Sequence, residues 1–365
     1  MRTVYGTKEQ ARREREKYRA ELEAQLNNES TEITVGGYAR EFHERRKTLG
    51  ELSPLTYERD NDQIKRMEKY LGNMPLEELN VQDVNKTYAK LRADGASASE
   101  LQKFHQKLKQ VLKQAVAEGS IAQNPCDLIT DIKKPEPKER RGLSLEQAVQ
   151  LAIDLKMSER NGKIVAVWLA LATGCRRGEA LGLLWKNVDL ERKRILYVEQ
   201  LDKKKNHRKQ KSKASKRNLA IDDGTVEFLK EWNAMQSKLF YNGRSVPPDS
   251  PVCTNQSGDF LSVSGFDKWR RQFFVEHGLG EYTKIEITYD QRGDKRYHRT
   301  GYHGFVLHEL RHTQATLLIG SDADIKTVQH RLGHSSASLT MNIYAHALEE
   351  NDRNAAETVG GLLEL

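Results

Sequence analysis

A short, charged segment with two prolines most constrains how this sequence can fold. The segment, DIKKPEPKERR, falls within residues 131–142 and separates two blocks with regular hydrophobic patterns. Proline interrupts helices and sheets, and the lysines and arginines keep such a segment solvated and extended. A chain of 365 residues is long enough for two or three domains. The sequence therefore predicts two folded domains joined by a basic linker.

The block before the linker, residues 31–130, predicts a bundle of four amphipathic helices. Val35 starts the first pattern, and Ser53-Pro54 opens the second as an N-cap followed by a first-turn proline. The third pattern ends at Gly95 and the fourth at Gly119. Short connections between such helices favour a compact bundle.

The two ends of the chain carry weaker signals. Residues 1–30 contain a charged helical pattern with few apolar positions, which predicts the tail of a small module or an arm that packs on a partner. Residues 351–365 form a tail whose leucines either dock on a neighbouring molecule or fray.

Composition limits the partners and the compartment. The net charge is +8 and the pI is about 9.1, which favours a polyanionic partner. The three cysteines, Cys126, Cys175 and Cys253, contain no C-x-x-C pair, so neither a disulfide framework nor a cysteine zinc site is expected. The sequence shows no apolar run of membrane-spanning length and no signal peptide. We therefore expect a cytoplasmic protein without a membrane partner.

The larger block, residues 143–350, begins with a helix capped by Ser144 and a very apolar helix over 163–174. The second helix runs into Thr173-Gly174-Cys175-Arg176. An arginine at the end of a buried helix is costly to desolvate unless a carboxylate or another anion meets it. Arg176 is therefore a candidate functional residue. Glu179 is expected to brace it, while Arg177 is expected to face solvent.

A strongly basic segment lies between two short strand patterns, 195–198 and 219–221, which predict a small antiparallel sheet. Residues 202–217 hold nine lysines or arginines and one aspartate. Such a charged turn repels itself unless it meets a polyanion, which favours contact with DNA. The candidate DNA contacts are Lys211, Lys216 and Arg217 here, Lys103 and Lys107 on the fourth helix, and Lys133, Lys134, Arg140 and Arg141 in the linker. A solvated helix face explains the lysines of the fourth helix nearly as well, and a plain basic linker explains the cations of the linker nearly as well.

The stretch from His308 to Tyr344 carries the chemistry. His308 and Arg311 stand three apart at the head of a helical pattern, so their side chains should leave the same face. A second helical pattern ends at Gly333, and His334 follows at once on a short turn. Tyr344 comes ten residues later. Two histidines, an arginine and a tyrosine can carry out phosphoryl transfer without a metal.

Other interpretations of this stretch remain open. HELRH also fits H-E-x-x-H, in which two histidines bind zinc, although Arg311 would place a permanent cation beside the metal. The following helices and the Gly turn also fit a helix-turn-helix reader or an ordinary buried hairpin. Upstream, residues 278–302 predict a β-hairpin turned at 292–294 without an assigned role, and its tyrosines Tyr289, Tyr297 and Tyr302 are rival hydroxyls.

Taken together, these motifs resemble the tyrosine recombinase (phage integrase) family over residues 31–346. Within the family the chain looks most like integrases of temperate phages and of conjugative transposons of Gram-positive bacteria. The resemblance implies a helical core-binding domain and an α+β catalytic domain, so the fold class is mainly α with a small antiparallel β-sheet. It also makes residues 1–30 a candidate remnant of an arm-binding module. The implied catalytic residues are Arg176, Lys213, His308, Arg311, His334 and Tyr344. Lys213 is placed by Ser212-Lys213-Ala214, where the family commonly has threonine in the third position.

The residue types suggest how the reaction proceeds. A tyrosine hydroxyl, with a pKa of about 10, attacks a phosphodiester only when its proton is removed and the phosphate charge is screened. Arg176 and Arg311 would clamp the non-bridging oxygens, so neither a metal nor a cofactor is expected. The resemblance implies double-stranded DNA attachment sites, a homotetramer on a four-way junction, and an excisionase or DNA-bending accessory protein as partners. A type IB topoisomerase and a non-catalytic DNA-binding repressor are the alternatives.

Overall fold

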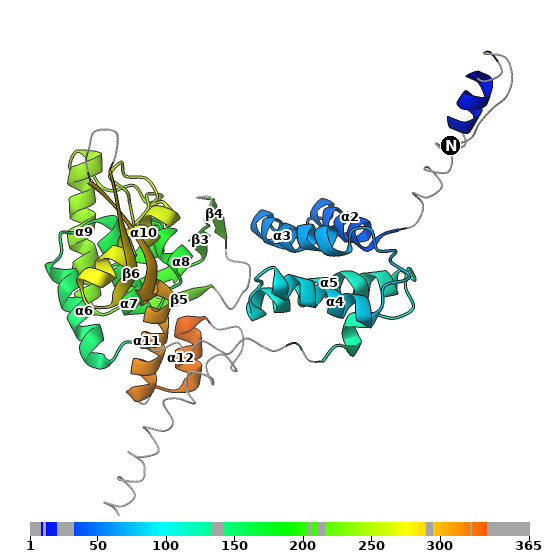
Figure 1. Cartoon of the computed structure of the whole chain (residues 1–365). Helices are drawn as coiled ribbons and strands as arrows, with labels where there is room; N and C mark the ends of the chain where they lie inside the picture. The colour runs from blue at the N-terminus through cyan, green and yellow to red at the C-terminus, as the bar shows by residue number, and fades with distance from the viewer. Residues whose placement is uncertain are drawn as a thin grey trace, which may run out of the picture. The chain divides into compact units, whose positions relative to one another are not determined.

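The computed structural model describes residues 9, 12–19, 33–130, 132, 142–202, 206–209, 216–289, 295–321 and 323–333 (Figure 1). The chain forms two compact units, Met1–Lys138 and Glu139–Leu365. Helices dominate both units among the described residues, and the short strands are antiparallel and belong to the second unit. The predicted fold class, mainly α with a small antiparallel sheet, is confirmed.

Helices with buried apolar faces build the first unit. The hydroxyl of Ser53 accepts a hydrogen bond from the backbone N–H of Thr56 at 3.3 Å, and Ser97 forms a capping box with Glu100. The inward side chains of these helices, such as that of Phe104, form one hydrophobic core. Residues 33–130 thus contain the four predicted helices, with bounds Val35–Thr48 (α2), Pro54–Leu71 (α3), Val81–Ala93 (α4) and Ala98–Ala117 (α5), followed by the 3-10 helix Pro125–Leu128 (η2). Residues 12–19 are also helical, and they are exposed.

The second unit is organised around the apolar helix α7, most of whose side chains are buried. It packs against α6 and α11. The N-cap of α6 is Ser144, as predicted, and its hydroxyl accepts from the N–H of Gln147 at 3.2 Å. The helices of this unit are Leu145–Met157 (α6), Gly162–Thr173 (α7), Arg177–Leu181 (α8), Trp185–Asn187 (η3), Asp223–Tyr241 (α9), Val263–Glu276 (α10), Leu307–Gly320 (α11) and Ile325–Leu332 (α12).

A small sheet covers one side of this core, in the order β1-β2-β5. β2 and β5 are the two predicted strands, and they pair with Ile195 opposite Leu219. The basic segment between them, expected as a charged turn, contributes to a second antiparallel ladder, in which β3 pairs with β4. Its strands are too short and too charged to show an apolar alternation. The bounds are Val188–Asp189 (β1), Arg194–Tyr197 (β2), Glu199–Leu201 (β3), His207–Lys209 (β4) and Arg217–Ala220 (β5).

The predicted hairpin before α11 is present. Its strands, Gly280–Tyr289 (β6) and Lys295–Gly304 (β7), pair antiparallel, and both contact α10 (Figure 1). The expected turn at residues 292–294 lies outside the described residues. Within the part of the chain that the structure describes, none of the helices is both long enough and apolar enough to cross a bilayer.

Candidate active site

The turn after α7 places Arg176 at the edge of the core. α7 ends at Gly174, whose φ of 61° is a left-handed conformation that glycine adopts without steric cost. A side chain would not fit there, because a Cβ atom would lie 2.5 Å from Gln314 Oε1 and 2.8 Å from Leu332 Cδ2. Arg176 follows as the N-cap residue of α8. The Thr-Gly-x-Arg motif therefore encodes the end of one helix and the start of the next.

Glu179 holds Arg176 by both its main chain and its side chain. It is the third residue of α8, the capping-box position. Its Oε2 accepts from the backbone N–H of Arg176 at 2.7 Å, and its Oε1 accepts from Nη1 of Arg176 at 2.8 Å. The predicted contact between these two residues is confirmed. Glu179 is only 1% exposed, so its charge needs further donors. Arg217 on β5 supplies them, with Nη1 at 3.0 Å from Oε1 and Nη2 at 2.7 Å from Oε2.

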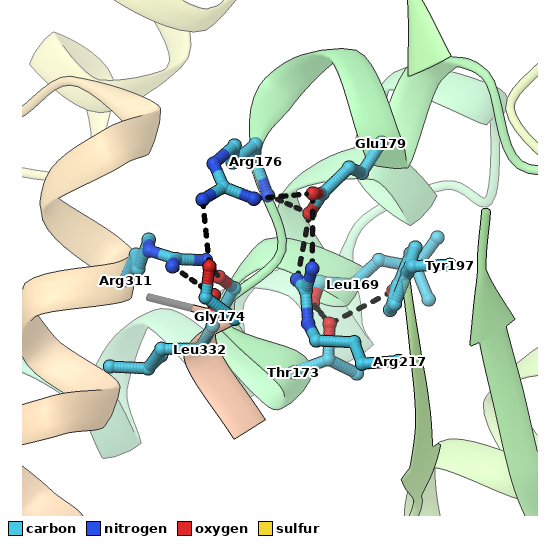
Figure 2. A network of polar contacts seen from close by, with 10 residues as sticks. Leu169, Thr173, Gly174, Arg176, Glu179, Tyr197, Arg217, Arg311 and Leu332 are labelled. Atoms are coloured by element: carbon cyan, nitrogen blue, oxygen red, sulfur yellow. Dashed lines mark hydrogen bonds and ion pairs between the residues drawn. The ribbon is translucent and has the colours of Figure 1, made fainter. Parts of the chain in front are cut away.

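Arg311 reaches the same place from α11. It is 2% exposed; its Nη1 donates to the carbonyl of Gly174 at 3.0 Å, and its Nη2 donates to the carbonyl of Leu332. Nη2 of Arg176 donates to the next carbonyl, that of Gly333, at 3.1 Å. Figure 2 shows both guanidinium groups directed at the end of α12. The structure therefore brings together two arginines that are far apart in the sequence.

The charges around this cluster are unbalanced. Among the residues drawn in Figure 2, the guanidinium groups of Arg176, Arg217 and Arg311 surround the single carboxylate of Glu179. Burial, followed by repulsion from Arg176 and then Arg217, lowers the pKa of Arg311. An anion bound between Arg176 and Arg311 would relieve this repulsion. The geometry and the charge therefore suit an oxyanion such as a phosphate.

His308 lies on the same helix as Arg311, but it is exposed. Its ring meets the ring of His312 edge-on, with 5.3 Å between the centroids. In the zinc interpretation of HELRH the glutamate would act beside the metal. Here Oε2 of Glu309 instead accepts from the backbone N–H of Val306 at 2.8 Å and caps the helix. Among the described residues, no group of three or more His, Cys, Asp and Glu side chains is placed to hold a metal.

Several predicted site residues lie outside the described residues, so their placement stays a prediction. They are Lys133, Lys134, Arg140, Arg141, Lys211, Lys213, His334 and Tyr344. Of the other candidate DNA contacts, Lys103 and Lys216 are exposed. Lys107 departs from the expected solvated row, because its Nζ lies 2.5 Å from Asp60 Oδ2 and its side chain is 12% exposed.

Arg217 requires a correction. It was grouped with surface lysines as a DNA contact, but it is 2% exposed and bound to Glu179, so that prediction is wrong. Side chains two residues apart share one face of a strand, and Leu219 is part of the core. That alternation was the available signal. Arg177, which was expected to face solvent, has a side chain that is 34% exposed, and its guanidinium also pairs with Asp267.

Comparisons with known proteins identify a family. A sequence model of the phage integrase family matches residues 141–351, and one of the phage integrase SAM-like domain matches residues 34–133. A tyrosine recombinase XerC-like protein of Caldanaerobacter subterraneus subsp. tengcongensis is 28% identical, covering 98% of this chain and 91% of its own. The ICEBs1 integrase of Bacillus subtilis is 22% identical, with 82% and 75% covered.

Two groups of solved structures share the fold. The Tn1549 transposon integrase in complex with transposon right end DNA superposes with a TM-score of 0.68 at 18% identity, covering 90% of this chain and 100% of that one. A lambda integrase tetramer bound to a Holliday junction gives a TM-score of 0.59 at 18% identity, covering 88% and 80%. The family match and the named relatives favour a recombinase over the topoisomerase and repressor alternatives. The chain belongs to the phage integrase family and is a tyrosine-type, site-specific DNA recombinase.

Proposed function

We propose that Arg176 and Arg311 bind the two non-bridging oxygens of the scissile DNA phosphate and that Tyr344 is the nucleophile. One observation carries this proposal: both guanidinium groups are directed at the carbonyls of Leu332 and Gly333, immediately before His334 in the sequence. Two arginines can neutralise the charge that develops on phosphorus during in-line attack. Tyr344 follows His334 by ten residues, and a chain of that length can bring its hydroxyl to a phosphate bound by the two arginines.

The proposed reaction conserves the phosphodiester bond energy. The hydroxyl oxygen of Tyr344 forms a bond to phosphorus while the bond from phosphorus to the 5′ oxygen breaks. His308 takes or relays the phenolic proton, Lys213 gives a proton to the leaving 5′ oxygen, and His334 donates a hydrogen bond to the phosphate. The products are a 3′-phosphotyrosine and a free 5′-hydroxyl. The 5′-hydroxyl of a second strand then reverses the attack, which rejoins DNA without ATP.

The substrate in this proposal is double-stranded DNA carrying the attachment sites of a mobile element, recombined in the bacterial nucleoid. Exchange between two duplexes needs four protomers, because each strand is cut by one tyrosine. The tetramer of lambda integrase on a Holliday junction supports a homotetramer here. An excisionase or a DNA-bending protein is the proposed accessory partner that sets the direction. The exposed Lys103 and Lys216 are proposed to contact the DNA backbone.

A nicked suicide substrate tests the active-site assignment. The short fragment that carries the free 5′-hydroxyl diffuses away, so the covalent protein–DNA adduct accumulates. Tyr344→Phe should bind the site normally and form no adduct, because the nucleophilic oxygen is missing. Tyr289→Phe and Tyr297→Phe are matched controls, since both tyrosines are exposed on the β6–β7 hairpin. Adduct formation by Tyr344→Phe, or its loss in a control, would overturn the assignment.

A chelator should leave the adduct yield unchanged, and a metal requirement would revive the zinc interpretation of HELRH.

A further inference from the structure

We infer that Arg217 is a positioning residue for DNA cleavage: it fixes the carboxylate of Glu179, which in turn orients the guanidinium group of Arg176. Arg217 itself lies inside the protein and needs no contact with DNA. The inference rests on the proposed phosphate-binding role of Arg176. It assigns a function to a residue that the sequence pattern had grouped with surface cations.

The hydrogen bonds form a chain from β5 to Arg176. Oε1 of Glu179 accepts from Nη1 of Arg176 at 2.8 Å and from Nη1 of Arg217 at 3.0 Å. Oε2 accepts from the backbone N–H of Arg176 and from Nη2 of Arg217, each at 2.7 Å. Both oxygens are therefore shared between the two arginines. Because Arg217 binds in the parallel, two-bond geometry, it fixes the plane of the carboxylate as well as its position.

The two arginines differ in how firmly they are held. Arg217 lies opposite Tyr197 in the β2–β5 pairing, and its guanidinium carbon is 5.0 Å from the centroid of that ring. The hydroxyl of Tyr197 is 2.9 Å from Thr173 Oγ1, which itself donates to the carbonyl of Leu169 at 2.7 Å. The sheet is thus tied to the end of α7. The side chain of Arg176 is 35% exposed, and its guanidinium is held by the carboxylate of Glu179 and the carbonyl of Gly333.

This arrangement predicts a pH signature. Burial raises the pKa of Glu179, but the hydrogen bonds and charge of Arg217, followed by those of Arg176, lower it by more, and the net pKa lies below its ordinary value. Arg311 adds positive charge from α11. Among the other described groups near Arg217, Arg331 on α12 adds further positive charge. Cys175 and Tyr197 have raised pKa values because they are buried, so they stay neutral near pH 7.

Removing Arg217 leaves the burial of Glu179 opposed by less positive charge, so its pKa must rise. The charged carboxylate then persists only at higher pH, and it is lost as the pH falls. Protonated Glu179 has one acceptor oxygen fewer for Arg176. An Arg217 variant should therefore cleave worst at mildly acidic pH and recover toward alkaline pH, which a general loss of stability would not produce.

Single-turnover formation of the covalent adduct, with saturating full-length enzyme on the nicked duplex, tests the inference. Arg217→Met should slow adduct formation roughly 10- to 100-fold at neutral pH, the range for misplacing a group that orients a catalytic one. The deficit should widen as the pH falls, while DNA affinity changes little. Arg217→Lys should recover part of the rate, because lysine keeps the charge but lacks the two-bond geometry. Arg217→Lys also serves if Arg217→Met does not fold.

Arg270→Met is the matched control. Arg270 is also buried in the second unit at 4% exposed, and its Nη1 donates to the carbonyl of Phe305 at 2.5 Å rather than to Glu179. This variant should lose stability yet cleave at the normal rate per folded molecule. Wild-type rates at every pH in Arg217→Met, or an equal and pH-independent loss in both variants, would overturn the inference. Arg176→Lys distinguishes the proposed function from the role of Arg217. If Arg176→Lys cleaves normally, the proposed function is wrong. If Arg176→Lys is inactive while Arg217→Met cleaves normally, only the inferred role of Arg217 is wrong.

Discussion

Replacing Gly174 with alanine tests how the end of α7 supports the two arginines. The φ of 61° forces alanine into the left-handed region, which costs about 1–2 kcal/mol. The new Cβ would also lie 2.5 Å from Gln314 Oε1 and 2.8 Å from Leu332 Cδ2. Relieving such overpacking adds about 1–3 kcal/mol. We therefore expect Gly174→Ala to lower the free energy of unfolding of the second unit by about 2–5 kcal/mol.

Gly278→Ala is the matched control for the backbone cost. Gly278 has a similar φ of +71°, but a Cβ there would meet nothing within 4 Å. It should lose only the left-handed cost of about 1–2 kcal/mol. Urea unfolding followed by tryptophan fluorescence reports on the second unit alone, because all the tryptophans lie there: Trp168, Trp185, Trp232 and Trp269.

Gly174→Ala should also impair catalysis, because the carbonyl of Gly174 accepts from Nη1 of Arg311. A shift of this turn moves a phosphate-binding group, so adduct formation should slow roughly tenfold or more at saturating DNA. Gly278→Ala should cleave normally. Equal losses of stability in the two variants would refute the steric argument. Normal cleavage by Gly174→Ala would refute the proposed link between the turn and Arg311.

Three further predictions follow from the described residues. Lys107→Met should destabilise the first unit by about 3 kcal/mol, because it leaves the buried carboxylate of Asp60 without its closest cation, and adding Asp60→Asn should recover most of the loss. Amide hydrogen exchange in α3 and α5 measures the change in stability, and full protection of these helices in the single variant would contradict the prediction. Lys103→Ala should reduce the slope of log affinity against log salt by about 0.9, and an unchanged slope would show that Lys103 does not contact phosphate. Burial raises the pKa of Cys126 to about 12 and also raises the pKa values of the other two cysteine thiols, so thiol reagents should label the native protein slowly even at mildly alkaline pH; rapid labelling before unfolding would contradict the burial.

The sequence alone was sufficient for the features that local chemistry encodes. Helix caps at Ser53 and Ser144 and the glycine stop at Gly333 involve residues within one or two turns of each other, so their patterns predicted where helices begin and end. The contact of Glu179 with Arg176 was also predictable, because the two residues are only three apart and carry opposite charges. The order of the motifs identified the family, which the comparisons confirmed.

The tertiary structure decided which charged residues are inside. Arg217 and Lys107 look like surface cations in the sequence, but one is buried against Glu179 and the other is held by Asp60. Whether a cation in a basic segment meets solvent or a buried carboxylate depends on strand register and on helices distant in the chain. The spacing of apolar residues does not reveal such pairings. A charged residue reads as an exposed position in that spacing, even where a distant residue of opposite charge allows it to be buried. The sequence by itself determined the helices and the reactive residue types. Only the folded chain determined that Arg217 binds the carboxylate that holds Arg176.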